Sequence, residues 1–169
     1  MKLSRIASHS NLMLAWRRIT TGSNQQYKRF FRSLYYAYEV ALYENIKDLR
    51  QRLIGGTYKP QHPERIYIPK PSGLHRPLAL LHIEDQIVLQ AFANLATKRL
   101  QSKRDPLQFK VIFSNIIQKP DNIFFFRTWQ DTYSAFQRKI RKNYKDGLRW
   151  VADFDLAAFY DTISHELLL

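Results

Sequence analysis

Residues 150–169 read WVADFDLAAFYDTISHELLL, and this stretch decides which fold the sequence predicts. It holds four acidic residues and neither Lys nor Arg, whereas all 27 basic residues of the chain precede it. Its acids are Asp153, Asp155, Asp161 and Glu166. A basic body that ends in an acidic, aromatic edge is typical of a protein that holds a polyanion near metal-binding carboxylates.

The composition points to one globular unit with an anionic partner. A chain of 169 residues with 45% hydrophobic content is long enough for one sizeable core, which argues against global disorder. The net charge of +13 and the 14% aromatic content favour nucleic acid, because phosphates meet Lys and Arg while bases stack on aromatic rings. The alternative is a basic surface without a binding site.

Two features of the sequence narrow its setting. The chain has no Cys, which excludes disulfides and thiolate metal sites and suits a reducing cytoplasm. No apolar run reaches the roughly 18 residues that a membrane span needs, and the N-terminus lacks the long apolar core of a secretory signal. We therefore expect a cytoplasmic protein without a membrane partner.

Leu148 to Asp155 alternates in polarity, which predicts a strand that carries Asp153 and Asp155 on one face. Two carboxylates near the end of a buried strand are costly unless a cation compensates them. Mg²⁺ chemistry on phosphates uses such oxygens, so the pair is a candidate metal site. The alternative is that one Asp caps the next turn while the other is solvated.

A hairpin is predicted in the first half of the chain. Arg65 to Ile68 alternates like a strand, Pro71-Ser72-Gly73 forms a turn, and His75 to Leu81 returns. Lys70 and Arg76 flank the turn, where a point charge and a planar guanidinium would bind a triphosphate in complementary ways. The alternative is two solvated charges near a turn.

Apolar residues at three- and four-residue steps predict three amphipathic helices. The first runs from Tyr27 to Leu53 as one long helix that ends at Gly55-Gly56. The second runs from Ile83 to Leu100, with Phe92 and Leu100 on its apolar side. Between the second and third helices the sequence is least informative, with a possible short strand from Phe109 to Phe113.

The third helix runs from Trp129 to Tyr144 and ends at Gly147. Its apolar stripe consists of Trp129, Tyr133, Phe136, Ile140 and Tyr144. Its far side is basic and consists of Arg138, Lys139, Arg141, Lys142 and Lys145. This basic side is either solvated surface or a grip on a phosphate backbone.

Three blocks of the sequence resemble the fingers and first palm motif of prokaryotic reverse transcriptases, which include group II intron, retron and defence-associated enzymes. The blocks are RIYIPKPSGLHRPL at 65–78, IEDQIVLQ at 83–90 and DLAAFYDTISHELL at 155–168, in the family's order. The resemblance implies an α+β fold in which helical fingers with a short antiparallel hairpin precede the first palm strand of a right-hand polymerase. It also implies RNA-directed DNA polymerase activity by two-metal nucleotidyl transfer.

The resemblance assigns roles residue by residue. Asp155 is implied as the first catalytic, metal-binding carboxylate, and the backbone carbonyl of Leu156 as a further metal ligand. Tyr160 occupies the position that packs under the incoming sugar and disfavours a 2′-hydroxyl. Lys70 and Arg76 fall where fingers residues clasp the triphosphate of the deoxynucleotide.

The resemblance also implies the remaining partners. Arg65, Gln86 and Gln90 lie in blocks that would contact nucleic acid, and Gln86 and Gln90 are one helical turn apart. The implied partners are an RNA template, a DNA or RNA primer and deoxynucleoside triphosphates. The implied cofactor is Mg²⁺.

The sequence departs from the family pattern in two places. FSNIIQKPDNIFFFRTWQ at 113–130 replaces the Gly-Phe-Arg-Pro-Gly-Arg-Ser-like segment of group II intron enzymes, which favours the defence-associated branch and a role in antiviral defence. The Tyr-x-Asp-Asp hairpin that supplies the remaining carboxylates is absent. We therefore expect an N-terminal fragment that is inactive alone, with a basic helical region at 1–60, fingers at 61–147 and the start of the palm at 148–169.

Two other function classes were weighed. A haloacid-dehalogenase-like phosphatase places its nucleophile in Asp-x-Asp-x-Thr/Val, but here the fifth position is Ala157 and little chain follows it. The second alternative is a non-catalytic RNA-binding module derived from a polymerase fingers region. A coding sequence that continues past Leu169 into a Tyr-x-Asp-Asp hairpin would exclude this second alternative.

Overall fold

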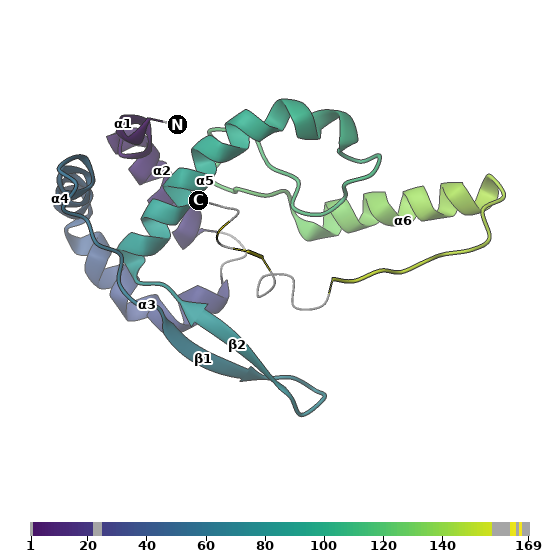
Figure 1. Ribbon diagram of the computed structural model, residues 1–169, viewed down its shortest axis with the longest axis horizontal. Coiled ribbons are helices and arrows are strands. Elements are labelled where there is room, and N and C mark those ends of the chain that lie inside the picture. Colours follow the sequence, from purple (N-terminus) through teal and green to yellow (C-terminus); the bar gives the residue numbers. More distant parts are fainter. Residues whose placement is uncertain (1, 22–24, 157–162, 165, 167–169) are drawn as a thin grey trace.

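The computed structural model describes residues 2–21, 25–156, 163, 164 and 166, and the side chains of 25–30 are not described. Over these residues the fold is mixed α+β, with six α-helices and one two-stranded antiparallel hairpin, so the expected class is confirmed at that level (Figure 1). In chain order the elements are α1 Leu3–Ile6, α2 His9–Thr20, α3 Gln25–Val40, α4 Leu42–Ile54, β1 Glu64–Pro69, β2 His75–Leu80, α5 Ile83–Arg104, the 3₁₀ turn η1 Asp105–Leu107 and α6 Trp129–Lys145.

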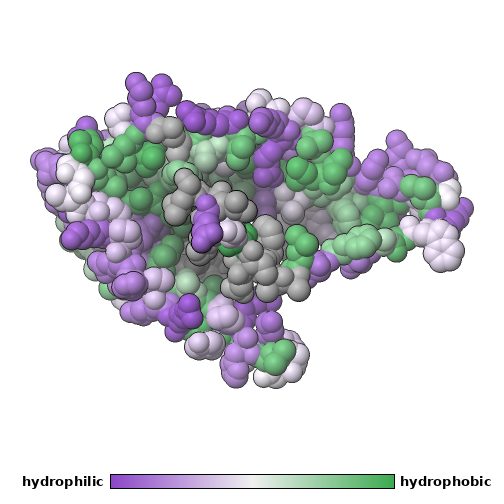
Figure 2. All heavy atoms as spheres, in the orientation of Figure 1, coloured by the Kyte–Doolittle hydropathy of each residue, from purple (hydrophilic) through white to green (hydrophobic). Residues whose placement is uncertain are grey.

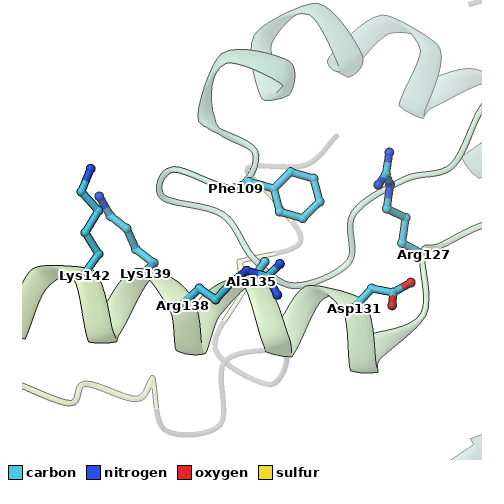
Figure 3. Close-up of a pocket in the computed structure, with 7 residues that line it drawn as sticks. All are labelled: Phe109, Arg127, Asp131, Ala135, Arg138, Lys139 and Lys142. Carbon is cyan, nitrogen blue, oxygen red and sulfur yellow. The ribbon is translucent and has the colours of Figure 1, made fainter.

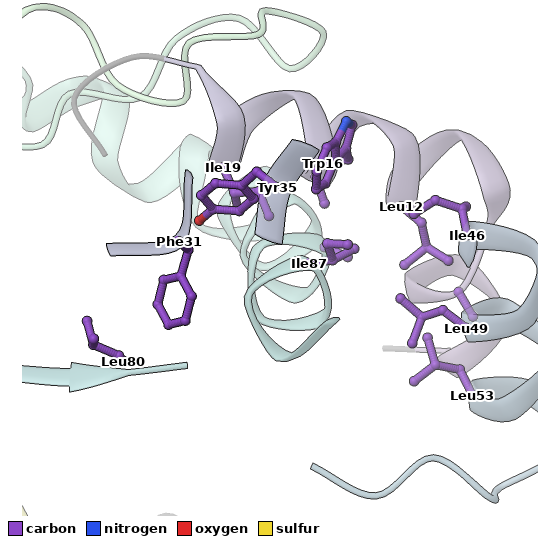
Figure 4. Packing of buried hydrophobic residues seen from close by; sticks show 13 residues of the cluster. Leu12, Trp16, Ile19, Phe31, Tyr35, Ile46, Leu49, Leu53, Leu80 and Ile87 are labelled. Atoms are coloured by element: carbon purple, nitrogen blue, oxygen red, sulfur yellow. The ribbon is translucent and has the colours of Figure 1, made fainter. Parts of the chain in front are cut away.

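The core lies where α2, α4 and α5 pack together, with α3 and the base of the hairpin closing it (Figure 4). In α2, Leu12, Trp16 and Ile19 recur at helical spacing and are buried, so one face of the helix is apolar. Ile46 and Leu49 of α4 are fully buried against the same cluster. These residues form one continuous core, from which α6 projects (Figure 1).

The single long helix predicted from Tyr27 to Leu53 is wrong, because the chain forms two helices that meet at Ala41. Ala41 leaves helical geometry with φ −121° and ψ 38°. The Asn45 side chain donates a 2.9 Å hydrogen bond to the Tyr38 carbonyl and so satisfies an acceptor that the break leaves free. The predicted end at Gly55-Gly56 is confirmed, since α4 ends at Ile54 and Gly56 has a φ of 68°.

The helix predicted from Ile83 is confirmed as α5, which extends four residues further than expected, to Arg104. Acidic residues in its first turn and basic residues in its last turn complement the helix dipole. Its predicted apolar side is partly wrong, because Phe92 and Leu100 are 49% and 51% exposed. The buried side instead includes the polar Asn94, which has partners on α2.

Arg18 on α2 joins three parts of the molecule. Its side chain is buried and donates to Asn94 Oδ1 on α5 (2.6 Å), to the Pro120 carbonyl (2.7 Å) and to the Asn122 carbonyl (2.9 Å). The guanidinium also lies 5.0 Å from the ring centroid of Phe125. Burial lowers the pKa of Arg18, and the charge of Asp121 partly opposes that change. The segment 116–127 is therefore fixed to the helical core through one side chain.

The helix predicted from Trp129 is confirmed as α6, which ends before Gly147 with a φ of 98°. Its apolar stripe is exposed rather than packed, and Trp129 and Tyr144 are 67% and 60% accessible. Hydrophobic side chains accordingly reach the surface along α6 (Figure 2).

Two predicted strands are absent from the described residues. Leu148 to Asp155 is extended but unpaired, with Trp150 and Phe154 95% and 89% exposed. Alternating polarity defines the two faces of a strand, whereas the ladder also needs a neighbour, and no described segment provides one. Phe109 to Phe113 likewise forms a tight loop with a single bridge between Gln108 and Ile112.

None of the helices in the described ranges is long and apolar enough to cross a membrane.

We expect Arg18→Met to lower the free energy of unfolding by about 3 kcal/mol, because Asn94 and two carbonyls lose their charged donor. Urea denaturation followed by circular dichroism measures this change. The matched control is Arg17→Met, since Arg17 is the exposed neighbour and should change stability by less than about 0.5 kcal/mol. Equal effects of the two substitutions would contradict the role of the Arg18 contacts.

Candidate functional site

The predicted hairpin is confirmed, with β1 and β2 antiparallel and Ile68 opposite Arg76. Its loop is short: the Gly73 amide donates to the Lys70 carbonyl (3.0 Å), and the Lys70 amide donates to the Leu74 carbonyl (2.7 Å). Gly73 has a φ of 81°, which a residue without a β-carbon adopts easily. Pro71 at the first corner and Gly73 at the last therefore fix a three-residue turn.

The register decides which charges share a face. Arg76 lies opposite Ile68 and shares a face with Ile66 and Leu78, which are half-buried nearer the core. Lys70 directly follows β1 at the same end of the hairpin. Both cations are exposed, and neither has an ion-pair partner among the described residues. The structure thus brings Lys70 and Arg76 together at the tip.

Arg65 does not join that pair. It lies opposite Ala79, on the other face of the hairpin and near its base. Its side chain is exposed. The hairpin therefore presents basic groups on both faces, with Lys70 and Arg76 at the tip and Arg65 behind them.

The base of the hairpin is clamped to the first turn of α5. The Tyr58 hydroxyl and the Gln61 amide both donate to the Asp85 carboxylate, the latter at 3.1 Å. Burial raises the pKa of the Tyr58 phenol, and the bond to Asp85 raises it further. Because residue 61 precedes β1 and Asp85 follows β2, one carboxylate fixes both ends of the hairpin.

A second link joins α4 to the same turn. Arg52 donates to Glu84 (2.5 Å) and to Asp48 (2.7 Å). The bond to Glu84 is the main reason that the pKa of Arg52 is raised. The hairpin consequently leaves the core from a well-anchored base.

Gln86 and Gln90, both predicted to bind nucleic acid, make hydrogen bonds inside the protein. Gln86 is buried, accepts from the Tyr35 hydroxyl (2.5 Å) and donates to the Leu81 carbonyl (2.7 Å). Gln90 is half-buried and donates to Asn94 Oδ1 (2.9 Å). Their positions indicate a structural role, and their contact with nucleic acid stays a prediction.

Asp155 and Leu156 lie on the extended segment after α6 and are exposed. Asp153 is exposed two residues earlier, and no hydrogen bond or ion pair joins Asp155 to another described residue. Tyr160, the predicted sugar-reading residue, lies outside the described residues. The structure places Asp155 in an accessible segment without the packing expected of a palm strand.

The described residues do not by themselves fit a Mg²⁺ site. No three acidic or histidine side chains cluster in the part of the chain that the structure describes. Asp155 and the Leu156 carbonyl supply too few oxygens for the roughly six-coordinate geometry that Mg²⁺ requires.

Sequence reasoning missed one basic pocket. It has a volume of about 480 Å³ and lies between the loop that carries Phe109 and the basic side of α6 (Figure 3). The helical residues in it, Arg138, Lys139 and Lys142, belong to the basic side that the periodicity identified. Phe109 and Arg127 come from the least informative stretch, where only the fold shows which residues face α6.

Comparison with curated proteins finds Protein YkfC of Escherichia coli (strain K12), which is 29% identical over 125 residues. The match covers 72% of this chain and 29% of that protein, so the chain matches less than a third of the length of this curated relative. The name of the relative states no activity. No protein-family model matches the sequence, and no solved structure matches the fold.

We expect Asp85→Ala to loosen the hairpin, because Tyr58 and the Gln61 amide lose their shared acceptor. The free energy of unfolding should fall by about 2 kcal/mol, and amide hydrogen exchange in β1 and β2 should accelerate. Asp48→Ala is the control, since it removes only an exposed carboxylate from Arg52 and should cost less than about 1 kcal/mol. Unchanged exchange in Asp85→Ala would contradict the clamp.

Proposed function

We propose that this chain is the nucleotide-binding and template-binding part of an RNA-directed DNA polymerase of the reverse transcriptase type. The observation that carries the proposal is the hairpin, which holds Lys70 and Arg76 together at an exposed tip. These are the two residues that the resemblance assigns to the triphosphate. A rigid turn and a clamped base suit a group that has to meet a ligand in one geometry.

In this proposal the hairpin tip binds the phosphates of a deoxynucleoside triphosphate. The guanidinium of Arg76 would bind two phosphate oxygens through parallel hydrogen bonds, while the ammonium of Lys70 would act as a point charge. Neither cation is neutralised by a described carboxylate, so both remain available to an anion. Arg65, on the opposite face, would contact the template backbone.

The second half of the proposal concerns residues 155–160. We propose Asp155 as a catalytic carboxylate, with the Leu156 carbonyl beside it, in a Mg²⁺ site completed by groups outside the described residues. Tyr160 is proposed to select the deoxyribose. The exposure of Asp155 is compatible with such a role, because its carboxylate has no partner within the described chain. The proposed setting is the cytoplasm, with an RNA template, a DNA or RNA primer and deoxynucleotides as partners.

The alternative function is a non-catalytic RNA-binding module. The observation that favours it is the distribution of charge, since exposed cations occur on the hairpin and on α6 alike. Such a module would bind RNA as the polymerase does and would not distinguish triphosphates from other anions at the hairpin tip.

We expect Lys70→Ala and Arg76→Ala each to weaken binding of a deoxynucleoside triphosphate by about tenfold, because each removes a charged donor. Isothermal titration calorimetry with dCTP and the 169-residue chain measures the affinity. Arg65→Ala is the matched control, being an exposed arginine of the same hairpin on the other face, and should stay within about twofold. An equal loss for Arg65→Ala would indicate a diffuse charge effect and remove the tip as a triphosphate site.

In a longer protein that contains this chain together with a Tyr-x-Asp-Asp hairpin, we expect Asp155→Asn to abolish Mg²⁺-dependent primer extension. RNA affinity in a filter-binding assay should remain nearly unchanged, because the substitution preserves the size of the side chain. The control is Asp153→Asn, two residues away, which should retain extension. Extension that survives Asp155→Asn would exclude the catalytic role.

A further inference from the structure

The basic pocket beside α6 combines charge with an aromatic ring. Its lining residues are Phe109, Arg127, Asp131, Ala135, Arg138, Lys139 and Lys142. Figure 3 shows the cations of α6 on one side and the Phe109 ring on the other. At about 480 Å³, the pocket lies within the range of sites that bind small organic groups such as a nucleotide.

The four cations of the pocket outnumber its one carboxylate. Asp131 accepts a 2.6 Å hydrogen bond from the Thr128 hydroxyl at the start of α6, so its charge is engaged at the helix N-terminus. Arg127, Arg138 and Lys142 are exposed, and none of them has an ion-pair partner among the described residues. The pocket therefore favours an anion.

The ring of Phe109 is held over the pocket by an unusual backbone. Phe109 has a φ of 59°, a left-handed conformation that is unfavourable for a residue with a β-carbon. The loop enforces it, since the Phe109 amide donates to the Ile112 carbonyl (2.9 Å) and the Leu107 carbonyl accepts from the amides of residues 110–112. The Phe109 side chain is 38% exposed, and the Arg127 guanidinium lies 5.4 Å from its centroid.

The arrangement of the cations is linear. Arg138 and Lys142 are one helical turn apart, about 6 Å along the axis of α6. An aromatic ring beside a row of cations is the combination that binds single-stranded nucleic acid, because bases stack on the ring while the backbone follows the charges. A duplex keeps its bases stacked inside, so it would leave the ring unused.

We propose that this pocket binds a single-stranded nucleic acid, with one unstacked base against Phe109 and the adjoining phosphates on Arg138, Lys139 and Lys142. The proposal rests on the nucleic-acid-binding part of the proposed function and adds a site on elements other than the hairpin. The strand would enter beside α6, whereas the triphosphate would be bound at the hairpin tip.

A charge-matched pair of double variants tests the backbone contact. Arg138→Ala/Lys142→Ala removes one Arg and one Lys from the pocket, and Arg141→Ala/Lys145→Ala removes the same types at the same spacing from outside it. With the 169-residue chain and fluorescein-labelled oligouridylate, fluorescence anisotropy should show about a tenfold loss for the pocket pair. The other pair should stay within about twofold. Its plot of log affinity against log salt should keep its slope, while that of the pocket pair flattens by about 1.4 for two phosphates.

The aromatic contact is tested separately with Phe109→Leu, which preserves an apolar side chain. We expect about a tenfold weaker affinity for oligouridylate and an unchanged salt slope. An abasic oligomer with the same phosphodiester backbone should bind the wild-type and Phe109→Leu chains equally, because it has no base to stack. Phe109→Tyr should restore oligouridylate binding, which separates stacking from a folding defect.

Equal losses for the two double variants would overturn the site, since binding would then follow total charge. A Phe109→Leu chain that discriminates between oligouridylate and the abasic oligomer as wild type does would overturn the stacking contact. Heparin that competes as well through the pocket pair as oligouridylate does would indicate a general polyanion surface. Triphosphate binding at the hairpin is measured independently, so the polymerase proposal and this site can fail separately.

Discussion

The buried guanidinium of Arg18 is the interaction on which the arrangement of this molecule depends. It reaches from α2 to Asn94 on α5 and to two carbonyls of the segment that leads into α6. No described carboxylate pairs with it directly, so its hydrogen bonds and Phe125 must compensate the cost of burying the charge. A methylated or shorter side chain could not make these three bonds at once, because only the planar fork of Arg reaches all three acceptors. The position of α6, and with it the basic pocket, follows from this one contact.

The hairpin is held in the opposite way, by several contacts at its base and none at its tip. Asp85 binds residues on both sides of β1 and β2, and Arg52 ties α4 to the same turn of α5. The tip is shaped only by its own turn, whose register is set by Pro71 and Gly73. A rigid base with an unobstructed tip allows Lys70 and Arg76 to meet a ligand without rearranging the core. The Phe109 loop follows the same principle, since a network of backbone hydrogen bonds presents one side chain.

The local signals in the sequence were sufficient for elements that are determined locally. The hairpin followed from alternation and a Pro-Ser-Gly turn, and α6 followed from its periodicity and Gly147. The break between α3 and α4 could not be predicted, because neither Gly nor Pro marks Ala41 and its stabiliser is the amide of Asn45. The strand at Leu148 to Asp155 failed for a related reason: alternation is a property of one segment, whereas pairing requires two. Gln86 illustrates the same limit for the site, since its partners Tyr35 and Leu81 come from other elements.

The exposed aromatic stripe of α6 has a colloidal consequence. Trp129, Tyr133 and Tyr144 are each more than half accessible, and Trp150 and Phe154 add to the hydrophobic surface nearby in sequence. Copies of the chain that approach through these surfaces gain hydrophobic free energy, while their net charge of +13 keeps them apart. The range of that repulsion shrinks from about 10 Å at 0.1 M salt to about 3 Å at 1 M. Solubility of this polypeptide is therefore a balance between ionic strength and a few unshielded rings.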